Sequence, residues 1–215
     1  DCGTCPGNWD PAQECAACQK AWNPDADCLE CLPGWSDSSC STQNECTRFV
    51  DIDSMATVPN GFGWSTAFRT ITEGIESAYA ATQKSGGPAT CDVWVAEGEY
   101  NVCDEFSSCA TTRTIALRSN VNVYGGFAGI ESALEERDFA VNTTIIDGKK
   151  GTINVDHALT SAKNVILSGF EVTNANPTFT NKLPTAGAAL IINTSMTVSD
   201  CVFRNNNARY GGAID

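Results

Sequence analysis

A pair of repeated strands near the end of the chain constrains the fold more than any other feature of the sequence. The segment Leu167–Asn174 (LSGFEVTN) aligns with Val198–Asn205 (VSDCVFRN), and Gly187–Leu190 (GAAL) aligns with Gly211–Ile214 (GGAI). Short apolar strands that return at a regular spacing between polar turns are the signature of a solenoid, in which each repeat packs against the next. We therefore expect equivalent positions to lie above one another in successive coils.

Strand alternation predicts which side chains fill the interior of these coils. Residues two apart on a strand share a face, and Gly169 adjusts this alternation locally. We expect a core stack of six side chains from two coils: Leu167, Phe170 and Val172, then Val198, Cys201 and Phe203. Cys201 is accordingly predicted to be a buried free thiol that packs as a small apolar residue.

The turns of the repeat carry two further predictions. Asn174 and Asn205 stand at equivalent turn positions and predict an asparagine ladder, because Asn tolerates left-handed backbone geometry and stacked amides can hydrogen-bond to one another. The two glycine segments begin 24 residues apart, whereas Leu167 and Val198 are 31 residues apart. The difference predicts an inserted loop, which we place at residues 176–184 because its two prolines cannot pair as a central strand.

Cysteine is the strongest signal in the composition, since eight of the 12 cysteines lie in the first 46 residues. They accompany Trp9, Trp22 and Trp35 in units that repeat every 13 residues and have almost no other apolar side chain. Such units need cross-links in place of a core, so the array predicts disulfides, an oxidising compartment and an exported protein. Zinc binding by the Cys-x-x-Cys pairs and a redox site are weaker alternatives, because no His and few basic groups accompany the cysteines.

The loop Cys31–Cys40 resembles the last disulfide loop of an epidermal-growth-factor-like module. The resemblance implies three disulfides: Cys31–Cys40 and, by repetition, Cys5–Cys15 and Cys18–Cys28. The expected role of the whole cysteine array is a stiff stalk or cap, with a partner-binding module as the alternative. Further along, Cys103 and Cys109 flank a short loop and are expected to pair, and Cys46 could join Cys91, although spacing does not fix connectivity.

The next part of the chain is similar to a capped β-helix. Residues 47–62 read as a linker, and residues 65–79 place apolar side chains at the spacing of an amphipathic helix, with Ser65 as its N-cap. This helix and the strand Val93–Tyr100 resemble the amino-terminal cap of pectin-lyase-like right-handed parallel β-helices. A cap is needed because the end of a β-helix exposes apolar interior and unpaired strand edges.

Two further blocks extend the resemblance over roughly residues 60–215. The block of residues 121–148 is similar to one in bacterial surface β-helix proteins, and Phe203–Asn206 and Gly211–Ile214 match the FxxN and GGA[ILV] repeats of polymorphic outer membrane proteins. The implied fold is all-β, a right-handed parallel β-helix with an amino-terminal capping helix, preceded by a small disulfide-rich segment. The expected domains are residues 1–46, the linker and residues 63–215, the last being truncated or edge-exposed at its end.

Charge excludes several classes of partner. The chain has 13 Lys and Arg against 26 Asp and Glu, a formal net charge of −13. This balance argues against a nucleic-acid-binding surface and against adsorption to anionic lipid. No apolar stretch reaches transmembrane length, so direct membrane insertion is not expected. The chain opens on Asp1 without a signal peptide, so Asp1 should follow a cleavage site or boundary; Asn142 and Asn193 begin N-glycosylation sequons.

The sequence does not predict a catalytic, cofactor or metal site. The single histidine, His157, follows Asp156, but neighbours on a strand point to opposite faces. Enzymes on this fold use clustered charged groups on an outer face, for which the candidates are Asp147, Lys149, Lys150, Asp156 and Lys163. Their spacing makes no convergent pair. Asp51 and Asp53 are too sparse for a calcium loop, so calcium is left open and not predicted.

These observations favour a non-enzymatic secreted or cell-surface protein, a β-helix rod on a disulfide-linked stalk with a structural or adhesive role. The expected partners are other copies of the chain, or surface proteins and glycans. An unpaired edge at the last coil could let copies stack head-to-tail into filaments. The alternative is a polysaccharide lyase or hydrolase on the same scaffold, which fold alone supports only by analogy.

Overall fold

The computed structural model describes residues 35–36, 42–43, 46–84, 87–177, 189–208 and 212–215. The chain divides into two compact units, Asp1–Glu45 and Cys46–Asp215. In the first unit, β1 (Trp35–Ser36) and β2 (Thr42–Gln43) form an antiparallel pair. The three disulfides expected in the amino-terminal array, and the inserted loop at residues 178–184, lie outside the described residues.

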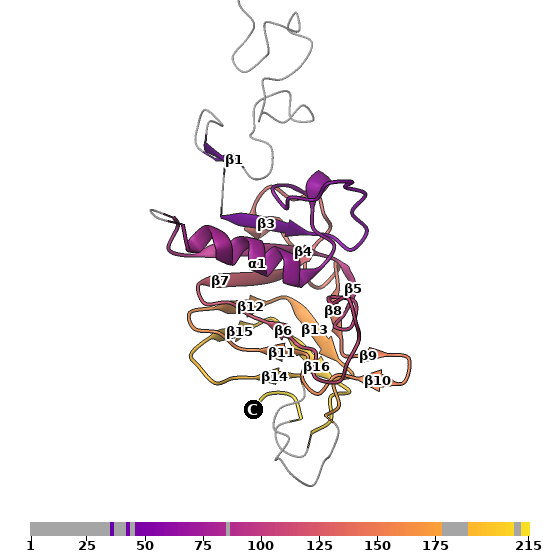
Figure 1. Ribbon diagram of the computed structural model, residues 1–215. Coiled ribbons are helices and arrows are strands. Elements are labelled where there is room, and N and C mark those ends of the chain that lie inside the picture. The colour runs from indigo at the N-terminus through magenta and orange to yellow at the C-terminus, as the bar shows by residue number, and fades with distance from the viewer. Residues whose placement is uncertain (1–34, 37–41, 44–45, 85–86, 178–188, 209–211) are drawn as a thin grey trace, which may run out of the picture. The chain divides into compact units, whose positions relative to one another are not determined.

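The second unit is mainly β and contains three sheets whose strands are all parallel (Figure 1). The five-stranded sheet contains β3 (Thr47–Val50), β4 (Cys91–Ala96), β7 (Val121–Phe127), β12 (Ile166–Ser168) and β15 (Thr197–Ser199). The four-stranded sheet contains β5 (Gly98–Asn101), β8 (Thr144–Asp147), β13 (Phe170–Thr173) and β16 (Val202–Arg204). The three-stranded sheet contains β6 (Ile115–Ala116), β11 (Leu159–Thr160) and β14 (Leu190–Ile191).

From β4 onward the chain visits the five-, four- and three-stranded sheets in that order and then begins again. The pairing confirms the repeat: Leu167 lies opposite Val198, Val172 lies opposite Phe203, and Leu190 forms an isolated parallel bridge with Ile214. Each coil therefore adds one strand to each sheet, which is a β-helix-like arrangement.

The predicted core stack is buried on one coil and half-buried on the next. Leu167, Phe170 and Val172 are at most 2% exposed. Their three partners pack against the same core but remain partly accessible. Cys201 is a free thiol, as predicted, but it is half-buried rather than buried. The physical reason is that β15 and β16 are the edge strands of their sheets, with a neighbouring strand on one side only.

The segment read as a linker belongs to the fold. Its first residues form β3, which pairs with β4 and buries Phe49 and Val50 almost completely. The helix also begins later than predicted: α1 spans Ile71–Thr82 with Thr70 as its N-cap, and Trp64–Thr66 forms a separate 3₁₀ turn. The α1 side chains of the apolar stripe pack into the core, beside β3 and β4 at one end of the stack (Figure 1).

The connections between the five- and four-stranded sheets differ in length from coil to coil. One residue joins β4 to β5, and one joins β12 to β13. Residues 128–143, which include a 3₁₀ turn at Leu134–Glu136, separate β7 from β8. A small hairpin of β9 (Lys149–Lys150) and β10 (Ile153–Asn154) follows β8. The long β7–β8 connection builds one wall of the cleft described below.

Candidate functional site

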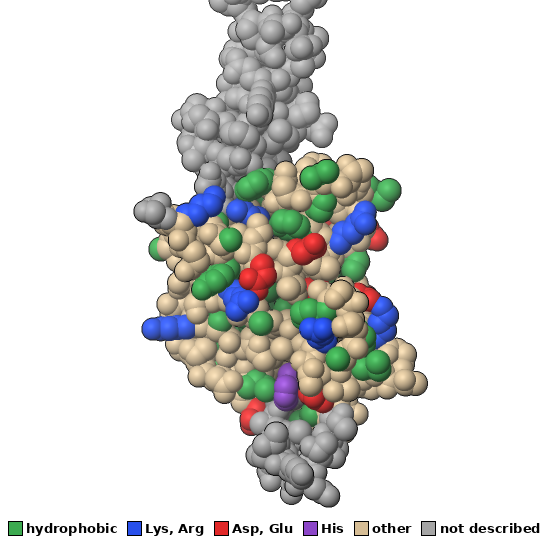
Figure 2. All heavy atoms as spheres, in the orientation of Figure 1, with side chains coloured by type: hydrophobic (Ala, Val, Ile, Leu, Met, Phe, Trp, Pro, Cys, Tyr) green, Lys and Arg blue, Asp and Glu red, His purple; other side chains and the backbone are tan. Residues whose placement is uncertain are grey.

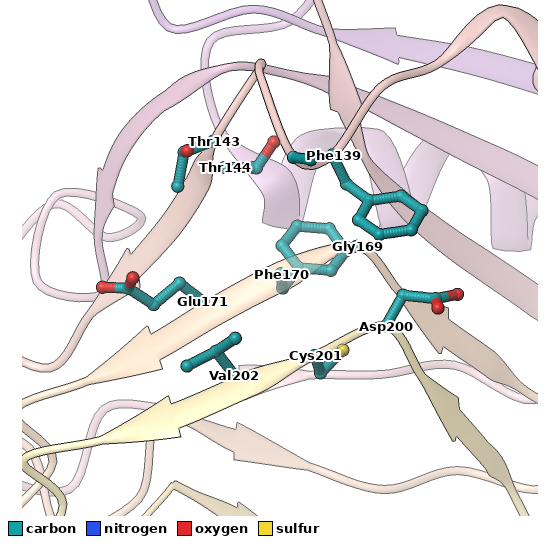
Figure 3. A pocket seen from close by; sticks show the side chains of 10 residues that line it. Phe139, Thr143, Thr144, Gly169, Phe170, Glu171, Asp200, Cys201 and Val202 are labelled. Atoms are coloured by element: carbon teal, nitrogen blue, oxygen red, sulfur yellow. The ribbon is translucent and has the colours of Figure 1, made fainter.

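A surface cleft of about 460 Å³ lies where the five- and four-stranded sheets meet (Figure 3). Its floor is the corner from β12 to β13 and from β15 to β16, and its wall is the end of the long β7–β8 connection. The residues that line it are Phe139, Ala140, Thr143, Thr144, Gly169, Phe170, Glu171, Asp200, Cys201 and Val202. We refer to it as the corner cleft.

Glu131 holds the beginning of the β7–β8 connection in place. Its carboxylate accepts hydrogen bonds from the backbone N–H groups of Ala128, Gly129 and Ile130, at 2.6, 3.1 and 3.0 Å. Its own carbonyl accepts a hydrogen bond from Trp64 Nε1 at 2.9 Å. A buried carboxylate with three backbone donors fixes the turn, because hydrogen bonds to a charged acceptor are stronger than those between neutral groups.

The corner itself requires two glycines that face one another across successive coils. A Cβ on Gly125 would lie 2.5 Å from the carbonyl oxygen of Gly169, and a Cβ on Gly169 would lie 2.6 Å from that of Gly125. Gly169 also has a φ of +83°, in the left-handed region that favours glycine. This close backbone approach explains why glycine occupies both positions.

Arg137 joins the connection to the strands below it. Its guanidinium lies over the rings of Tyr124 and Phe139, at 5.1 and 5.5 Å from their centroids. It donates hydrogen bonds to the carbonyl oxygen and the hydroxyl of Ser168, at 3.4 and 3.0 Å. The Ser168 hydroxyl in turn donates to the carboxylate of Asp200 at 3.1 Å, so one polar chain runs from Arg137 to the cleft.

The lining combines exposed apolar surface with carboxylates. Phe139 is 42% exposed and Val202 is 56% exposed, both high values for large apolar side chains. Phe139 and Asp200 lie on one side of the cleft, and Glu171 and Thr143 lie on the other (Figure 3). Glu171 is ion-paired with Arg204.

Cys201 also lines the corner cleft. Burial raises the pKa of its thiol, while backbone hydrogen bonds at Phe170 and Gly169 oppose the shift. The thiol donates a weak hydrogen bond to the carbonyl oxygen of Leu167 at 3.7 Å. A half-buried thiol that is mostly protonated near neutral pH is a poor nucleophile, because the thiolate is the reactive form.

The charged residues named from the sequence are spread over the second unit. Asp147 ends β8 and accepts hydrogen bonds from the Lys149 backbone and from the Asn174 amide, both at 2.9 Å. Lys150 is ion-paired with Asp104, and Lys163 precedes the turn into β12. Asp156 and His157 lie between β10 and β11, half-buried. None of the five charged candidates lines the corner cleft.

The structure shows two disulfides among the described residues, Cys46–Cys91 and Cys103–Cys109. Asn174 and Asn205 both have positive φ, at 62° and 55°. Asn174 donates its amide to Asp147, and it is Asn206 that reaches the coil below, through Val172 O at 2.8 Å. A direct amide-to-amide hydrogen bond joins Asn164 to Asn120 at 3.2 Å, at a different corner from the expected ladder of Asn174 and Asn205.

Sequence reasoning missed the residues of the corner cleft, apart from those assigned to the core. Phe139, Asp200 and Glu171 come from three coils, and no motif links them. One sequence feature could have located the cleft: more residues separate β7 from β8 than separate the equivalent strands of neighbouring coils. Insertions on one side of a solenoid often mark a binding face.

The described residues contain no helix that is long and apolar enough to cross a membrane. They also contain no cluster of three or more side chains suited to a metal ion. Acidic and basic side chains are interspersed on the face shown in Figure 2, where no basic patch is seen.

Comparison with known proteins gives one match. No curated protein and no solved structure matches the chain. A family model, described as a protein of unknown function (DUF1565), matches residues 60–213, which contain all the residues of the corner cleft. The chain therefore belongs to the DUF1565 family.

Proposed function

We propose that this chain is an exported, right-handed parallel β-helix with a non-enzymatic, adhesive role, and that it binds a neutral glycan in the corner cleft. The recurring order of the three parallel sheets supports a solenoid. The similarity to pectin-lyase-like and polymorphic outer membrane protein repeats supports a right-handed winding of its coils. The cysteine-rich first unit supports an EGF-like stalk. The two disulfides support export, since disulfides persist in oxidising compartments.

One observation carries the glycan proposal: exposed apolar side chains and carboxylates share a single cleft. A sugar ring presents C–H faces and hydroxyl groups together. Phe139 and Val202 offer apolar surface to the first, and Asp200 offers acceptor oxygens to the second. Ligand sites commonly have this composition, a largely apolar lining with a few polar groups that fix orientation.

Charge favours a neutral glycan over an acidic one. The cleft contains the carboxylates of Asp200 and Glu171, and the whole chain has a formal net charge of −13. A polyanion such as a polyuronate would meet repulsion from both. The same reasoning disfavours anionic surfaces as partners of this face.

The alternative function is a polysaccharide hydrolase or lyase at the same cleft, because Glu171 and Asp200 are two carboxylates in one cavity. A hydrolase needs one of the pair to hold a proton for the leaving group. Glu171 is ion-paired with Arg204, and Asp200 accepts a hydrogen bond from the Ser168 hydroxyl, so both carboxylates are already engaged by neighbouring side chains. Both arrangements suit binding better than acid catalysis.

The test is binding of the whole chain to immobilised neutral oligosaccharides, with polyuronates on the same surface. We expect binding to neutral glycans that falls about tenfold in Phe139→Ala and in Asp200→Asn, the loss of roughly one apolar contact or one charged hydrogen bond. Matched controls are Met55→Ala, another exposed apolar residue, and Glu135→Gln, another exposed carboxylate.

Three outcomes would overturn the proposal. Binding to polyuronates alone would show that the charge argument is wrong. Equal losses in the control variants would show that binding lies elsewhere. Shortened products after incubation with a bound glycan, detected by mass spectrometry and abolished in Glu171→Gln, would establish the enzyme instead.

A further inference from the structure

The capped end of the fold exposes three large aliphatic side chains. Met55, Val58 and Ile130 are 88%, 79% and 82% exposed. Met55 and Val58 belong to the connection from β3 to α1, and Ile130 belongs to the β7–β8 connection. The hydrogen bond from Trp64 to the carbonyl oxygen of Glu131 ties these two connections together. Single exposed aliphatic residues are common on protein surfaces, whereas a group of them marks an interaction site.

A second contact brings the aliphatic positions close to one another. Gly129 packs against Asp51, since a Cβ added to Gly129 would lie 3.8 Å from the Oδ2 atom of Asp51. The Ser54 N–H donates to the Asp51 carbonyl oxygen at 3.0 Å, which turns the chain just before Met55. Ile130 directly follows Gly129, and Met55 directly follows Ser54. Both aliphatic residues therefore leave the backbone on either side of one contact.

Four carboxylates lie beside this aliphatic group: those of Asp51, Asp53, Glu97 and Glu99. Ile52 stands between the first two and Gly98 between the last two, and a Cβ on Gly98 would lie 2.7 Å from the Ile52 side chain. The four acidic residues therefore meet at one corner, where three are exposed and Asp51 is half-exposed. Arg69 offsets part of this charge, since its Nε donates to the Ser54 carbonyl oxygen at 2.7 Å, but the carboxylates outnumber it.

The negative charge also reaches the residue beneath this corner. The hydroxyl of Tyr100 accepts a hydrogen bond from the Ile52 N–H at 3.1 Å. Burial raises the pKa of Tyr100 above its usual range, against the opposing effect of this hydrogen bond. Nearby negative charges raise it further, and they belong to Asp51, Glu105 and Asp53. The corner therefore has a negative potential, which attracts cations.

We propose that this corner binds a basic segment of a protein partner, one that carries both aliphatic side chains and Lys or Arg. We refer to it as the cap surface, formed by Met55, Val58, Ile130 and the four carboxylates. Opposite charge speeds association and disfavours wrong partners, while the aliphatic side chains supply apolar area to bury. A second copy of the chain, with a formal net charge of −13, and an anionic membrane both have the wrong sign of charge.

The test is binding of the whole chain to three fluorescein-labelled peptides of equal length, followed by fluorescence anisotropy. One peptide alternates Lys with Leu, the second Lys with Ser, and the third Glu with Leu. We expect the Lys–Leu peptide to bind about tenfold tighter than either of the others, because it alone supplies both charge and apolar surface. Raising NaCl from about 50 to about 300 mM should weaken this binding, since exposed charges are screened.

Variants of the cap surface separate its two components. The double variant Val58→Ser with Ile130→Ser should weaken binding of the Lys–Leu peptide about tenfold at every salt concentration, because apolar burial is lost. The double variant Asp53→Asn with Glu97→Gln should weaken it about as much at low salt and much less at high salt. Both should keep the urea midpoint of the wild type, since all four side chains are exposed.

Matched controls lie elsewhere on the β7–β8 connection. Val141→Ser removes another exposed aliphatic side chain, which is 72% exposed. The double variant Glu135→Gln with Asp138→Asn removes two exposed carboxylates. Neither control should change the affinity for the Lys–Leu peptide by more than about twofold.

Four outcomes would overturn the proposal. They are absence of binding to the Lys–Leu peptide, equal binding of all three peptides, equal losses in the control variants, and binding that neither salt nor the carboxylate variant weakens. The cap-surface variants should leave the binding of neutral glycans unchanged, because none of the substituted residues lines the corner cleft. Failure here therefore leaves the proposed function intact, and failure of glycan binding leaves the cap surface intact.

Discussion

Glu131 is the residue on which the wall of the corner cleft depends most. Its carboxylate accepts three backbone hydrogen bonds at the start of the β7–β8 connection, and the side chain is 7% exposed. Glu131→Ala should lower the free energy of unfolding by about 2 kcal/mol, because three partly buried N–H donors lose a charged acceptor. Glu131→Gln keeps one acceptor oxygen and should cost less. Urea-induced unfolding measures both.

The matched control for Glu131 is Glu135→Ala in the same connection. Glu135 is exposed, and exposed substitutions usually change stability by about 0.5 kcal/mol or less. Equal effects of Glu131→Ala and Glu135→Ala would contradict the assignment. The cleft offers a second readout, since loss of the wall should also weaken glycan binding in Glu131→Ala.

Cys201 gives a prediction that depends on pH. Because burial raises the pKa of its thiol, alkylation by iodoacetamide in the native protein should rise with pH to a midpoint above that of an unperturbed cysteine, about 8.5. Peptide mapping by mass spectrometry follows Cys201 separately from the other cysteines. In denaturant the same peptide should react as a free cysteine does. A native midpoint at or below about 8.5 would show that burial does not control this thiol.

Residue positions in the repeat were predictable, but their accessibility was not. The alternation of Leu167, Phe170 and Val172 fixes their face, because period two is a local property of a strand. The exposure of Cys201 depends on β15 and β16 being edge strands, which is a property of the assembled sheet. The Asn164–Asn120 contact was missed for a similar reason: 44 residues separate the two asparagines, and only the coil brings them together.

At the scale of elements, α1 shows how a distant loop can set a helix start. The first two N–H groups of the helix, those of Ile71 and Thr72, donate to the Glu105 carboxylate at 3.0 and 2.6 Å. Glu105 lies in the loop closed by Cys103–Cys109. The prediction of a start at Ser65 overlooks a local signal, the pair of Thr70 and Glu73, in which the Thr70 hydroxyl accepts a hydrogen bond from the Glu73 N–H. The Glu105 acceptor comes from another segment and leaves no local pattern.

Glu105 therefore carries a stability prediction. Glu105→Ala should lower the free energy of unfolding by about 2 kcal/mol, because two helix N–H groups lose their acceptor. Glu99→Ala, an exposed glutamate on β5, is the control. Urea unfolding followed by circular dichroism measures the difference. An effect of Glu105→Ala no larger than that of Glu99→Ala would show that solvent caps the helix equally well.

The pH dependence of this cap has a definite sign. Burial raises the pKa of Glu105, against the opposing effect of its hydrogen bonds with Thr72 and Ile71. A carboxyl whose pKa is higher in the folded state contributes stability below its unfolded pKa, about 4.3, and loses it as pH rises through the folded pKa. The stability of the wild type relative to Glu105→Gln should therefore fall as pH rises from about 4. A relative gain with rising pH would contradict the shift.

At the scale of the molecule, the parallel strands were predictable and the cleft was not. Repeat spacing determines which strands pair, because each coil must stack its apolar positions on the last. The corner cleft depends on the β7–β8 connection, which occurs in one coil and has no period to detect. The connection contains Glu131 and Arg137 and follows Gly125, but no local pattern shows what these residues do. Gly125 is required because it lies against Gly169 of the next coil. Arg137 has its role because it donates a hydrogen bond to Ser168 of the same coil as Gly169.

The two disulfides of the second unit should stabilise it to different extents. Cys46–Cys91 closes a loop with a sequence separation of 45 that contains β3 and α1, whereas the separation in Cys103–Cys109 is 6. In the chain-entropy model, a longer loop restricts the unfolded chain more, giving about 4 kcal/mol for the first bond and about 2 kcal/mol for the second. We expect paired Cys→Ala substitutions at 46 and 91 to lower the urea midpoint more than those at 103 and 109. The reverse order would mean that Cys103–Cys109 acts mainly in the folded state, by holding Glu105 against α1. The double variant at 103 and 109 would then lose no further stability on Glu105→Ala.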